Sequence, residues 1–165
     1  MVIDPGSEQS AIVIYDYEFT ILGSPKAQGR PRTRVIQPKS GSKAFATIYE
    51  TKEDKAAKEH IRMSVAPFAP DELLDGPLRV DVFFYLKRPM NHYGTGKNSG
   101  VLKERFAEIH HISKPDRDNL DKLVLDALTG VVWTDDSRIC QGWVEKQYGE
   151  APCVIVCVKN LSGGE

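Results

Sequence analysis

Apolar residues recur along the chain with spacings that predict strands. A run of β-branched and aromatic residues at 11–22 (AIVIYDYEFTIL) is typical of a strand. Two shorter runs near the C-terminus, at about 138–148 and 153–159, predict two more strands joined by a turn at GEAP. At 78–86 apolar side chains alternate with a period of two, which predicts a strand with one buried face formed by Leu78, Val80, Val82, Phe84 and Leu86.

Two other segments have the spacing of helices. Thr51, followed three positions later by Asp54, is a good N-cap for a helix that runs to about Ala66. A second helix is expected to begin with Asp118 as its cap and to end at Gly130. The apolar positions of this second helix fall on one side, and they are Leu120, Leu123, Val124, Ala127 and Leu128.

Two long stretches lack a regular period. Glycine and proline interrupt the segment GSPKAQGRPRTR at 23–34, so regular structure is expected to break there, with a short extended piece following at 45–50. Residues 87–113 are polar, with one helical turn expected at 101–106. Loops of this length inside a compact domain are usually functional or disordered. The element order β, α, β, long loop, α, β, β predicts an α+β fold with one mixed or antiparallel sheet and two main helices.

The composition narrows the class of protein. The chain has 165 residues, of which 41% are hydrophobic and 27% charged, and this favours one domain, expected at 11–160 after a flexible tail at 1–10. The opening residues lack the features of a secretory signal, and no apolar run approaches the roughly 18 residues of a membrane span. The cysteines are too few and too irregular for a disulfide framework, which favours a reducing, cytoplasmic setting: Cys140, Cys153 and Cys157.

Charge is segregated along the chain although the net charge is only −1. Between Phe19 and Tyr49 there are six bases and no acid, and between Val82 and Lys103 there is again no acid. Each run taken alone is also compatible with a solvated loop. The acids are concentrated elsewhere, above all in residues 114–139, so the chain could place phosphates beside metal ions.

The stretch 114–139, KPDRDNLDKLVLDALTGVVWTDDSRI, holds six acidic side chains. On a helix, Asp118, Lys122 and Asp126 would share one face. Asp116 lies two residues before Asp118, so the two side chains could point the same way if the backbone there is extended. Asp135 and Asp136, reached after the chain turns back, could close the cluster, and convergent carboxylates suit Mg²⁺.

A purely structural interpretation of the same residues stays open. Asp118 would then only cap the helix, Lys122 would bridge Asp121 and Asp126 on a solvated face, and Asp135 with its neighbour would belong to a turn. Trp133 is expected to pack in the core, with stacking on an unpaired base as the alternative.

The same stretch resembles the signature of RusA-type Holliday-junction resolvases, which are endonucleases of phages and prophages. The segments GSPKAQGRPR and LKRPMNHYGTGKNSGVLK are similar to the basic N-terminal segment and the central loop of that family, so the resemblance covers most of residues 17–145. It implies a homodimeric, structure-selective endodeoxyribonuclease that cuts four-way DNA junctions in recombination and repair. It also implies phosphodiester hydrolysis with Mg²⁺, for which Mn²⁺ substitutes, in the cytoplasm of a bacterial or phage-infected cell.

The resemblance further implies roles for individual residues. Asp116, Asp118 and Asp136 would be the metal ligands and catalytic carboxylates, and Lys122 matches the family's functional lysine. Asn119 and Asp135 would support the site. Basic and aromatic residues of the two loops are predicted to contact DNA: Lys26, Arg30, Arg32, Tyr93 and Lys97. A structure-selective DNA-binding protein without cleavage is the alternative, but such a protein would not need the matched carboxylates and lysine.

Overall fold

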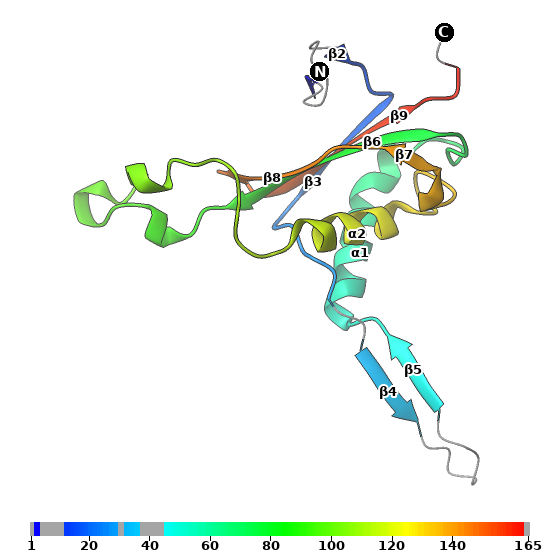
Figure 1. Ribbon diagram of the computed structural model, residues 1–165, viewed down its shortest axis with the longest axis horizontal. Helices are drawn as coiled ribbons and strands as arrows, with labels where there is room; N and C mark the ends of the chain where they lie inside the picture. The colour runs from blue at the N-terminus through cyan, green and yellow to red at the C-terminus, as the bar shows by residue number, and fades with distance from the viewer. Residues whose placement is uncertain (1, 4–11, 30–31, 37–44, 164–165) are drawn as a thin grey trace.

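One mixed sheet with two helices on a single face forms the body of the protein (Figure 1). The structure is a computed structural model that describes residues 2–3, 12–29, 32–36 and 45–163. The sheet contains β3 (Tyr17–Leu22), β9 (Cys153–Asn160), β6 (Leu78–Lys87), β7 (Ile139–Gln141) and β8 (Val144–Gly149). Strand β9 pairs antiparallel with β3 and β6, whereas β7 and β8 pair parallel with β6, one after the other. The predicted α+β fold with a mixed sheet and two main helices is confirmed.

The first predicted strand, at 11–22, consists of two separate strands. Its beginning is β2 (Ile12–Val13), which pairs with β1 (Val2–Ile3), and only its second half, β3, joins the main sheet. Of the tail predicted at 1–10, Val2–Ile3 is therefore described as a strand, and the remaining residues lie outside the described part of the chain.

The predicted strand at 138–148 is interrupted at Gly142 and Trp143, which separates β7 from β8. At this break the Trp143 amide donates a hydrogen bond to the Asp81 carboxylate over 2.8 Å. A Cβ atom at position 142 would lie 2.4 Å from the Val80 carbonyl oxygen, so only glycine fits against β6 there. The strand is thus divided by a close contact that the apolar pattern does not reveal.

The core lies between the sheet and the helices. The predicted inward residues of β6 are all buried, as are Phe19 and Ile21 of β3 and the apolar positions of the second helix. Trp133 is 0% exposed, and its indole N–H donates to the Thr129 hydroxyl over 3.1 Å. The prediction that Trp133 belongs to the core is confirmed.

Helix α1 (Lys52–Val65) begins as the sequence predicts. The Thr51 hydroxyl accepts a hydrogen bond from the Asp54 amide over 3.1 Å and so caps the helix. The chain continues into a short 3₁₀ helix, η1 (Ala66–Phe68). Within the described ranges, no helix is both long enough and apolar enough to cross a bilayer.

Helix α2 (Arg117–Leu128) begins earlier than predicted. Asp116, whose backbone is extended, occupies the N-cap position without a side-chain capping bond, and its carbonyl accepts the Leu120 amide over 3.2 Å. The prediction that Asp118 caps this helix is therefore wrong, because Asp118 already lies in the first turn. Gly130, with φ of 80°, follows the end of the helix as predicted.

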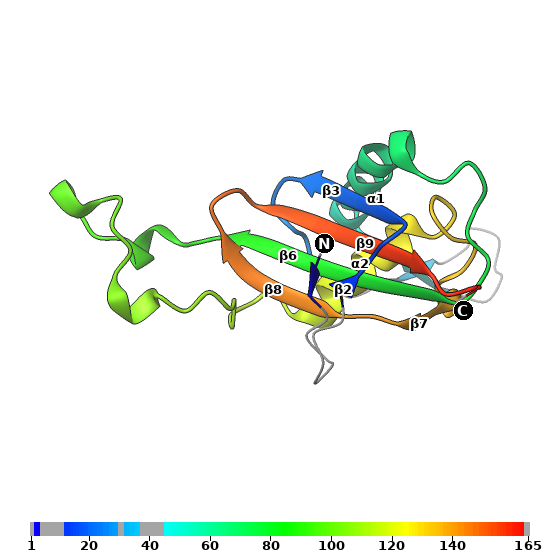
Figure 2. The same cartoon turned by 90° about the horizontal axis from the view of Figure 1, so that it is seen from above.

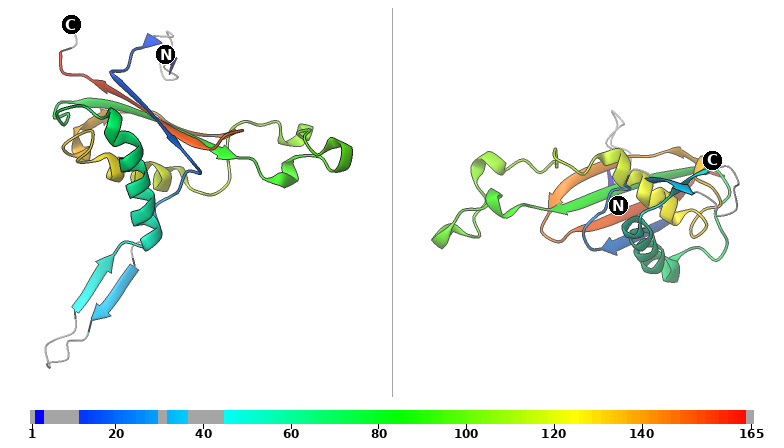
Figure 3. Two further views of the ribbon diagram at one scale, coloured as in Figure 1. Left: turned by 180° about the vertical axis from the view of Figure 1, so that it is seen from behind. Right: turned by 90° about the horizontal axis from the view of Figure 1, so that it is seen from below.

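Two segments project from the body. Strands β4 (Arg32–Ile36) and β5 (Phe45–Tyr49) form an antiparallel pair that extends away beyond the beginning of α1 (Figure 3). The extended piece predicted at 45–50 is confirmed as β5, but the predicted break at 23–34 is wrong for its last residues, where β4 begins. Strand β4 was missed because its pairing partner lies ahead in the sequence, beyond the reach of local propensity.

The second projection, residues 88–113, extends past the ends of β6 and β8 (Figure 2). It contains three 3₁₀ helices, η2 (Met90–His92), η3 (Gly96–Asn98) and η4 (Glu104–Phe106), of which only η4 was predicted. The His92 ring stacks on the Phe106 ring with 4.0 Å between centroids. The Arg88 guanidinium lies 4.5 Å from the centre of the Tyr148 ring and donates to two carbonyls of the projection. This base fixes the projection to the sheet.

Candidate active site

The beginning of α2 presents two exposed carboxylates. Asp116 is at the N-cap position and Asp118 is in the first turn, and both side chains are exposed. The positive end of the helix dipole favours negative charge at this point. The segment leading into the helix is held by Lys146, whose ammonium donates to the Ser113 and Pro115 carbonyls over 2.6 and 2.7 Å. The two carboxylates therefore lie at a fixed place beside β8.

Asp118 and Asp126, which were expected on one face of α2, have different surroundings in the structure. Lys122 is exposed, as is Asp118 four positions earlier. Asp126, in contrast, is turned toward α1, where its carboxylate accepts a hydrogen bond from Lys58 over 3.0 Å. Asp126 therefore does not join the exposed Asp118 and Lys122. The alternative of a solvated face formed by Asp121 and Asp126 and bridged by Lys122 is wrong, because Asp121 is partly buried and Lys58 binds Asp126.

Asp121 is a partly buried acid that the sequence did not single out. Its Oδ1 atom is buried and has no hydrogen-bond partner among the described residues. Burial raises the pKa of this carboxyl group against the opposing effect of Arg117. It lines a cavity of about 250 Å³ together with residues of β7 and β8 such as Cys140 and Val144. Asp121 directly follows Leu120, at the edge of the apolar stripe of α2. This position was the sequence signal that the Asp121 side chain would be partly buried.

Asp135 and Asp136 lie where the chain returns toward the sheet. The Asp135 carboxylate accepts the Ser137 amide over 2.9 Å and caps the 3₁₀ helix η5 (Asp136–Arg138). These bonds from Ser137 hold the pKa of Asp135 below its usual value. Asp136 is the first residue of η5 and is exposed. Asp135 thus has a structural role in the turn, and the carboxylate of the next residue, Asp136, is exposed to solvent.

The predicted metal ligands lie at opposite ends of α2. Lys146, which holds Pro115, pairs with Phe84 of β6, whereas Ile139, just after η5, pairs with Leu78 at the start of β6. Six residue steps of strand correspond to about 20 Å. Figure 1 shows α2 extending along the sheet from the side of β8 toward that of β7.

The described residues accordingly contain no group of three or more His, Cys, Asp or Glu side chains arranged to hold a metal ion. Asp116 and Asp118 by themselves fit Mg²⁺, which often takes only one or two protein carboxylates and completes its shell with water and phosphate. The three-carboxylate set with Asp136 does not form within one chain.

Comparison with known proteins identifies the family. Residues 23–159 match the family described as endodeoxyribonuclease RusA. The chain belongs to this family. It is also 30% identical over 145 residues to the uncharacterized protein YqaN of Bacillus subtilis (strain 168), a match that covers 88% of this chain and 96% of that protein. Membership supports an endonuclease activity on branched DNA junctions and, in general terms, a dependence on divalent metal.

The residues predicted to contact DNA are distributed over the surface of this RusA-family fold. Lys26 is exposed and lies at an apolar pocket of about 280 Å³ between α1 and the sheet. Lys97 is exposed and Tyr93 is half-buried in the 88–113 projection. Arg30 lies outside the described residues, and of Arg32 only the backbone, in β4, is described.

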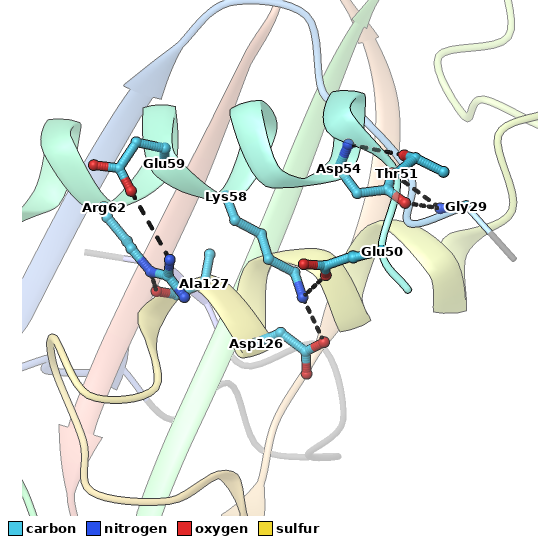
Figure 4. A network of polar contacts seen from close by, with 9 residues as sticks. All are labelled: Gly29, Glu50, Thr51, Asp54, Lys58, Glu59, Arg62, Asp126 and Ala127. Atoms are coloured by element: carbon cyan, nitrogen blue, oxygen red, sulfur yellow. Dashed lines mark hydrogen bonds and ion pairs between the residues drawn. The ribbon is translucent and has the colours of Figure 1, made fainter. Parts of the chain in front are cut away.

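A polar network on α1 connects the β4–β5 hairpin to α2 (Figure 4). Lys58, which is buried, bonds to Asp126 of α2 over 3.0 Å and to Glu50, directly after β5, over 2.5 Å. The Asp54 carboxylate accepts the Gly29 amide over 3.1 and 3.2 Å, on the chain leading toward β4. Both ends of the hairpin are therefore tied to the helix that packs on α2.

Asn119 takes part in this arrangement through its backbone. Its carbonyl accepts the Gln28 amide over 2.9 Å, so the basic segment at 23–29 passes directly beside the beginning of α2. Asn119 is half-buried at this contact. The hydrogen bond from Gln28 to Asn119 holds segment 23–29, which precedes the β4–β5 hairpin, against α2. The segment therefore has a fixed position relative to Asp116 and Asp118.

Replacing Lys58 with alanine is expected to lower the free energy of unfolding by about 1–3 kcal/mol, because two partly buried carboxylates lose their shared donor. Urea denaturation followed by circular dichroism measures the change. Lys55→Ala, at an exposed position of the same helix, is the matched control and should change stability by less than about 0.5 kcal/mol. Equal stabilities of the two variants would contradict a structural role for the network.

Proposed function

We propose that this protein is a Mg²⁺-dependent endodeoxyribonuclease that resolves Holliday junctions during DNA recombination and repair, acting as a homodimer in the cytoplasm of a bacterial or phage-infected cell. The observation that carries the proposal is the pair of exposed carboxylates at the beginning of α2, Asp116 and Asp118, inside the region that matches the RusA family. Asp135, which caps η5, holds the turn that presents Asp136.

The chemistry of these side chains supports hydrolysis of a phosphodiester. Asp116 and Asp118 supply the oxygen ligands that a hard divalent cation prefers. A bound divalent cation would neutralise charge on the scissile phosphate and lower the pKa of a water ligand. Lys122, exposed one turn after Asp118 in the middle of α2, brings a positive charge near the two carboxylates and would stabilise the negative charge that develops on the phosphate.

The distribution of basic residues supports binding of branched DNA. The acid-free stretch between Phe19 and Tyr49 passes beside the beginning of α2 at Gln28 and continues into the β4–β5 hairpin. The second acid-free stretch enters the 88–113 projection. Two projections in different directions would contact two duplex arms, with Lys26, Arg30 and Arg32 on one side and Tyr93 and Lys97 on the other. A four-way junction has two equivalent scissile phosphates, which a two-fold dimer serves symmetrically.

The alternative is a structure-selective DNA-binding protein that does not cut. The same two acid-free stretches would serve that function equally well. Exposed carboxylates beside a phosphate-binding surface repel DNA unless a cation lies between them, so Asp116 and Asp118 favour the nuclease.

A synthetic four-way junction tests the proposal. Wild-type protein is expected to nick opposing strands at symmetric positions with Mg²⁺ or Mn²⁺ and to lose this activity completely when the cation is chelated, with recovery when Mg²⁺ is restored in excess. A linear duplex of the same sequence is the control and should stay intact. Cleavage that persists after thorough chelation would contradict metal dependence, and tight junction binding without cleavage in either cation would establish the binding protein instead.

A further inference from the structure

We infer that the apolar pocket between α1, α2 and the sheet binds one unstacked nucleobase of a branched DNA, while the ammonium group of Lys26 binds the phosphate of the same nucleotide. The inference rests on the proposed function and extends it, because it assigns a site to the branch point of the DNA. The pocket has a volume of about 280 Å³. Pockets for drug-sized ligands have about 300–1,000 Å³, so this one suits a single planar ring system.

The floor of the pocket is apolar and belongs to the core. Buried side chains of five elements form it: Ile21 of β3, Ile61 of α1, Phe84 of β6, Leu123 and Val124 of α2, and Val154 of β9. Helix α1 contributes two alanines, Ala56 and Ala57, whose short side chains leave the space above this floor unfilled. Enzymes that extrude a nucleotide from DNA hold the base between apolar or aromatic side chains in the same way.

Residues 22–26 form the rim of the pocket, and hydrogen bonds fix the beginning of this rim. The Gly23 amide donates to the Pro152 carbonyl over 3.1 Å, and the Leu22 carbonyl accepts from Nε2 of His60 over 2.9 Å. Gly23 has φ of 116°, a conformation that favours glycine, and it turns the chain out of β3. The pocket is therefore largely formed before a ligand binds, which lowers the entropic cost of binding.

The other end of the rim lies against α2. The Gln28 amide donates to the Asn119 carbonyl over 2.9 Å, so the chain reaches the first turn of α2 two residues after Lys26. Figure 1 shows this segment continuing toward the β4–β5 hairpin. A nucleotide in the pocket would thus lie beside the helix that carries the proposed nuclease site, on the acid-free stretch that is proposed to bind DNA.

Polar groups at the rim match the polar parts of a nucleotide. Lys26 is exposed, and none of the described residues forms a hydrogen bond or an ion pair with its side chain, so the ammonium group is available to a phosphate. Because Nε2 of His60 donates to a carbonyl, Nδ1 of the neutral ring is left as an acceptor. Ser24 adds a hydroxyl that both donates and accepts. The described lining contains no carboxylate that would repel the phosphate.

A site for an unstacked base would make binding depend on the structure of the DNA. The cost of extruding a base is lowest where its pairing is already weakened. At the centre of a four-way junction the strands change partners, so the base pairs there are held less firmly than those within an arm. The pocket would therefore accept a base at the branch point in preference to one in a linear duplex.

A fluorescent base tests the inference. Four-way junctions carry 2-aminopurine, whose fluorescence is quenched by stacking, at each position beside the branch point in turn. Wild-type protein is added with the cation chelated, so that the junction stays intact, and gel shifts of the same samples show binding. Fluorescence at one or more of these positions is expected to rise severalfold on binding, because the base leaves the stack for a mainly aliphatic pocket. A junction with 2-aminopurine in the middle of one arm is the control and should not change.

Filling the pocket tests whether this site holds the base. Ala57→Leu is expected to abolish the rise in fluorescence and to lower the preference for the junction over a linear duplex by about 5-fold or more, the smallest usual effect of losing contacts to one base. The same substitution at Ala66, an exposed position directly after α1, is the matched control and should leave both properties unchanged. Urea denaturation shows that both variants are folded.

The outcomes separate this inference from the proposed function. A rise in fluorescence that Ala57→Leu removes and Ala66→Leu keeps supports the base site. Junction binding without any rise overturns the inference, leaves the nuclease in place and assigns the pocket to a different ligand, such as an apolar side chain of a protein partner. A rise that persists in folded Ala57→Leu protein also overturns it, because the base would then be unstacked elsewhere. Failure of the wild-type protein to bind the junction would overturn the proposed function, and this inference with it.

Discussion

Asp118→Asn protein is expected to bind a four-way junction but to cut it at least about 100-fold more slowly than wild type. Changes to residues that merely support metal ligands already cost roughly 10- to 100-fold, so loss of a ligand's charge should cost at least as much. Asparagine keeps the size of aspartate and stays in the first turn of α2, where the side chain is exposed, so the fold should not change. Binding should persist or strengthen, because a negative charge near the DNA is removed.

Gel-shift titration and a nicking assay on the same labelled junction measure the two properties separately. Asp71→Asn is the matched control, since it removes one exposed carboxylate far from α2 in the sequence and should cut like wild type. Unaltered cleavage by Asp118→Asn protein would exclude this residue from the site. Loss of binding and cutting together would instead assign Asp118 to DNA recognition or to folding.

Local sequence patterns were sufficient for much of the fold. The period of two at 78–86 identified the buried face of β6, and Thr51 with Asp54 located the start of α1 to the residue. Trp133 was correctly expected in the core. These predictions succeeded because each depends on neighbours within a few residues, where strand alternation and helix capping follow from backbone geometry.

Features that depend on distant parts of the chain were not predictable from spacing. Strand β4 exists because of β5, and the break between β7 and β8 exists because Gly142 presses against Val80. Asp126 was expected beside Lys122, but Lys58, 68 positions away in the sequence, holds it against α1. A helical wheel gives the direction of a side chain but not the neighbour that it meets.

The candidate site shows the same division between local and distant information. Residues Asp116 and Asp118 were expected together because they are two positions apart, and the structure places both at the beginning of α2. The expected convergence with Asp136 required the chain to return along the whole length of the helix. It does not do so, because the bonds of Leu74 to Val132 and Thr134 hold the returning segment at the far end.

Trp133→Ala is expected to lower the free energy of unfolding by about 3–5 kcal/mol, the usual cost of removing a large aromatic side chain from a core. Trp133 is 0% exposed, and its indole bonds to Thr129 at the end of α2. The residues on either side of it hold Leu74, so the same change should loosen the segment that carries Asp136. Urea denaturation followed by circular dichroism measures the loss.

Two further substitutions separate the contributions to this effect. Trp143→Ala is the matched control, because Trp143 is 37% exposed on the sheet and its removal leaves a smaller cavity, so its cost should be clearly lower. Trp133→Phe keeps most of the apolar volume but loses the bond to Thr129, and should cost about 1–2 kcal/mol, an amount between those of a lost hydrogen bond and a cavity. If Trp133→Ala destabilised the protein no more than Trp143→Ala, Trp133 would not be the packing centre of this end of the fold. The fixed position of Asp136 would then need another cause, such as the bond between Arg138 and Asp75.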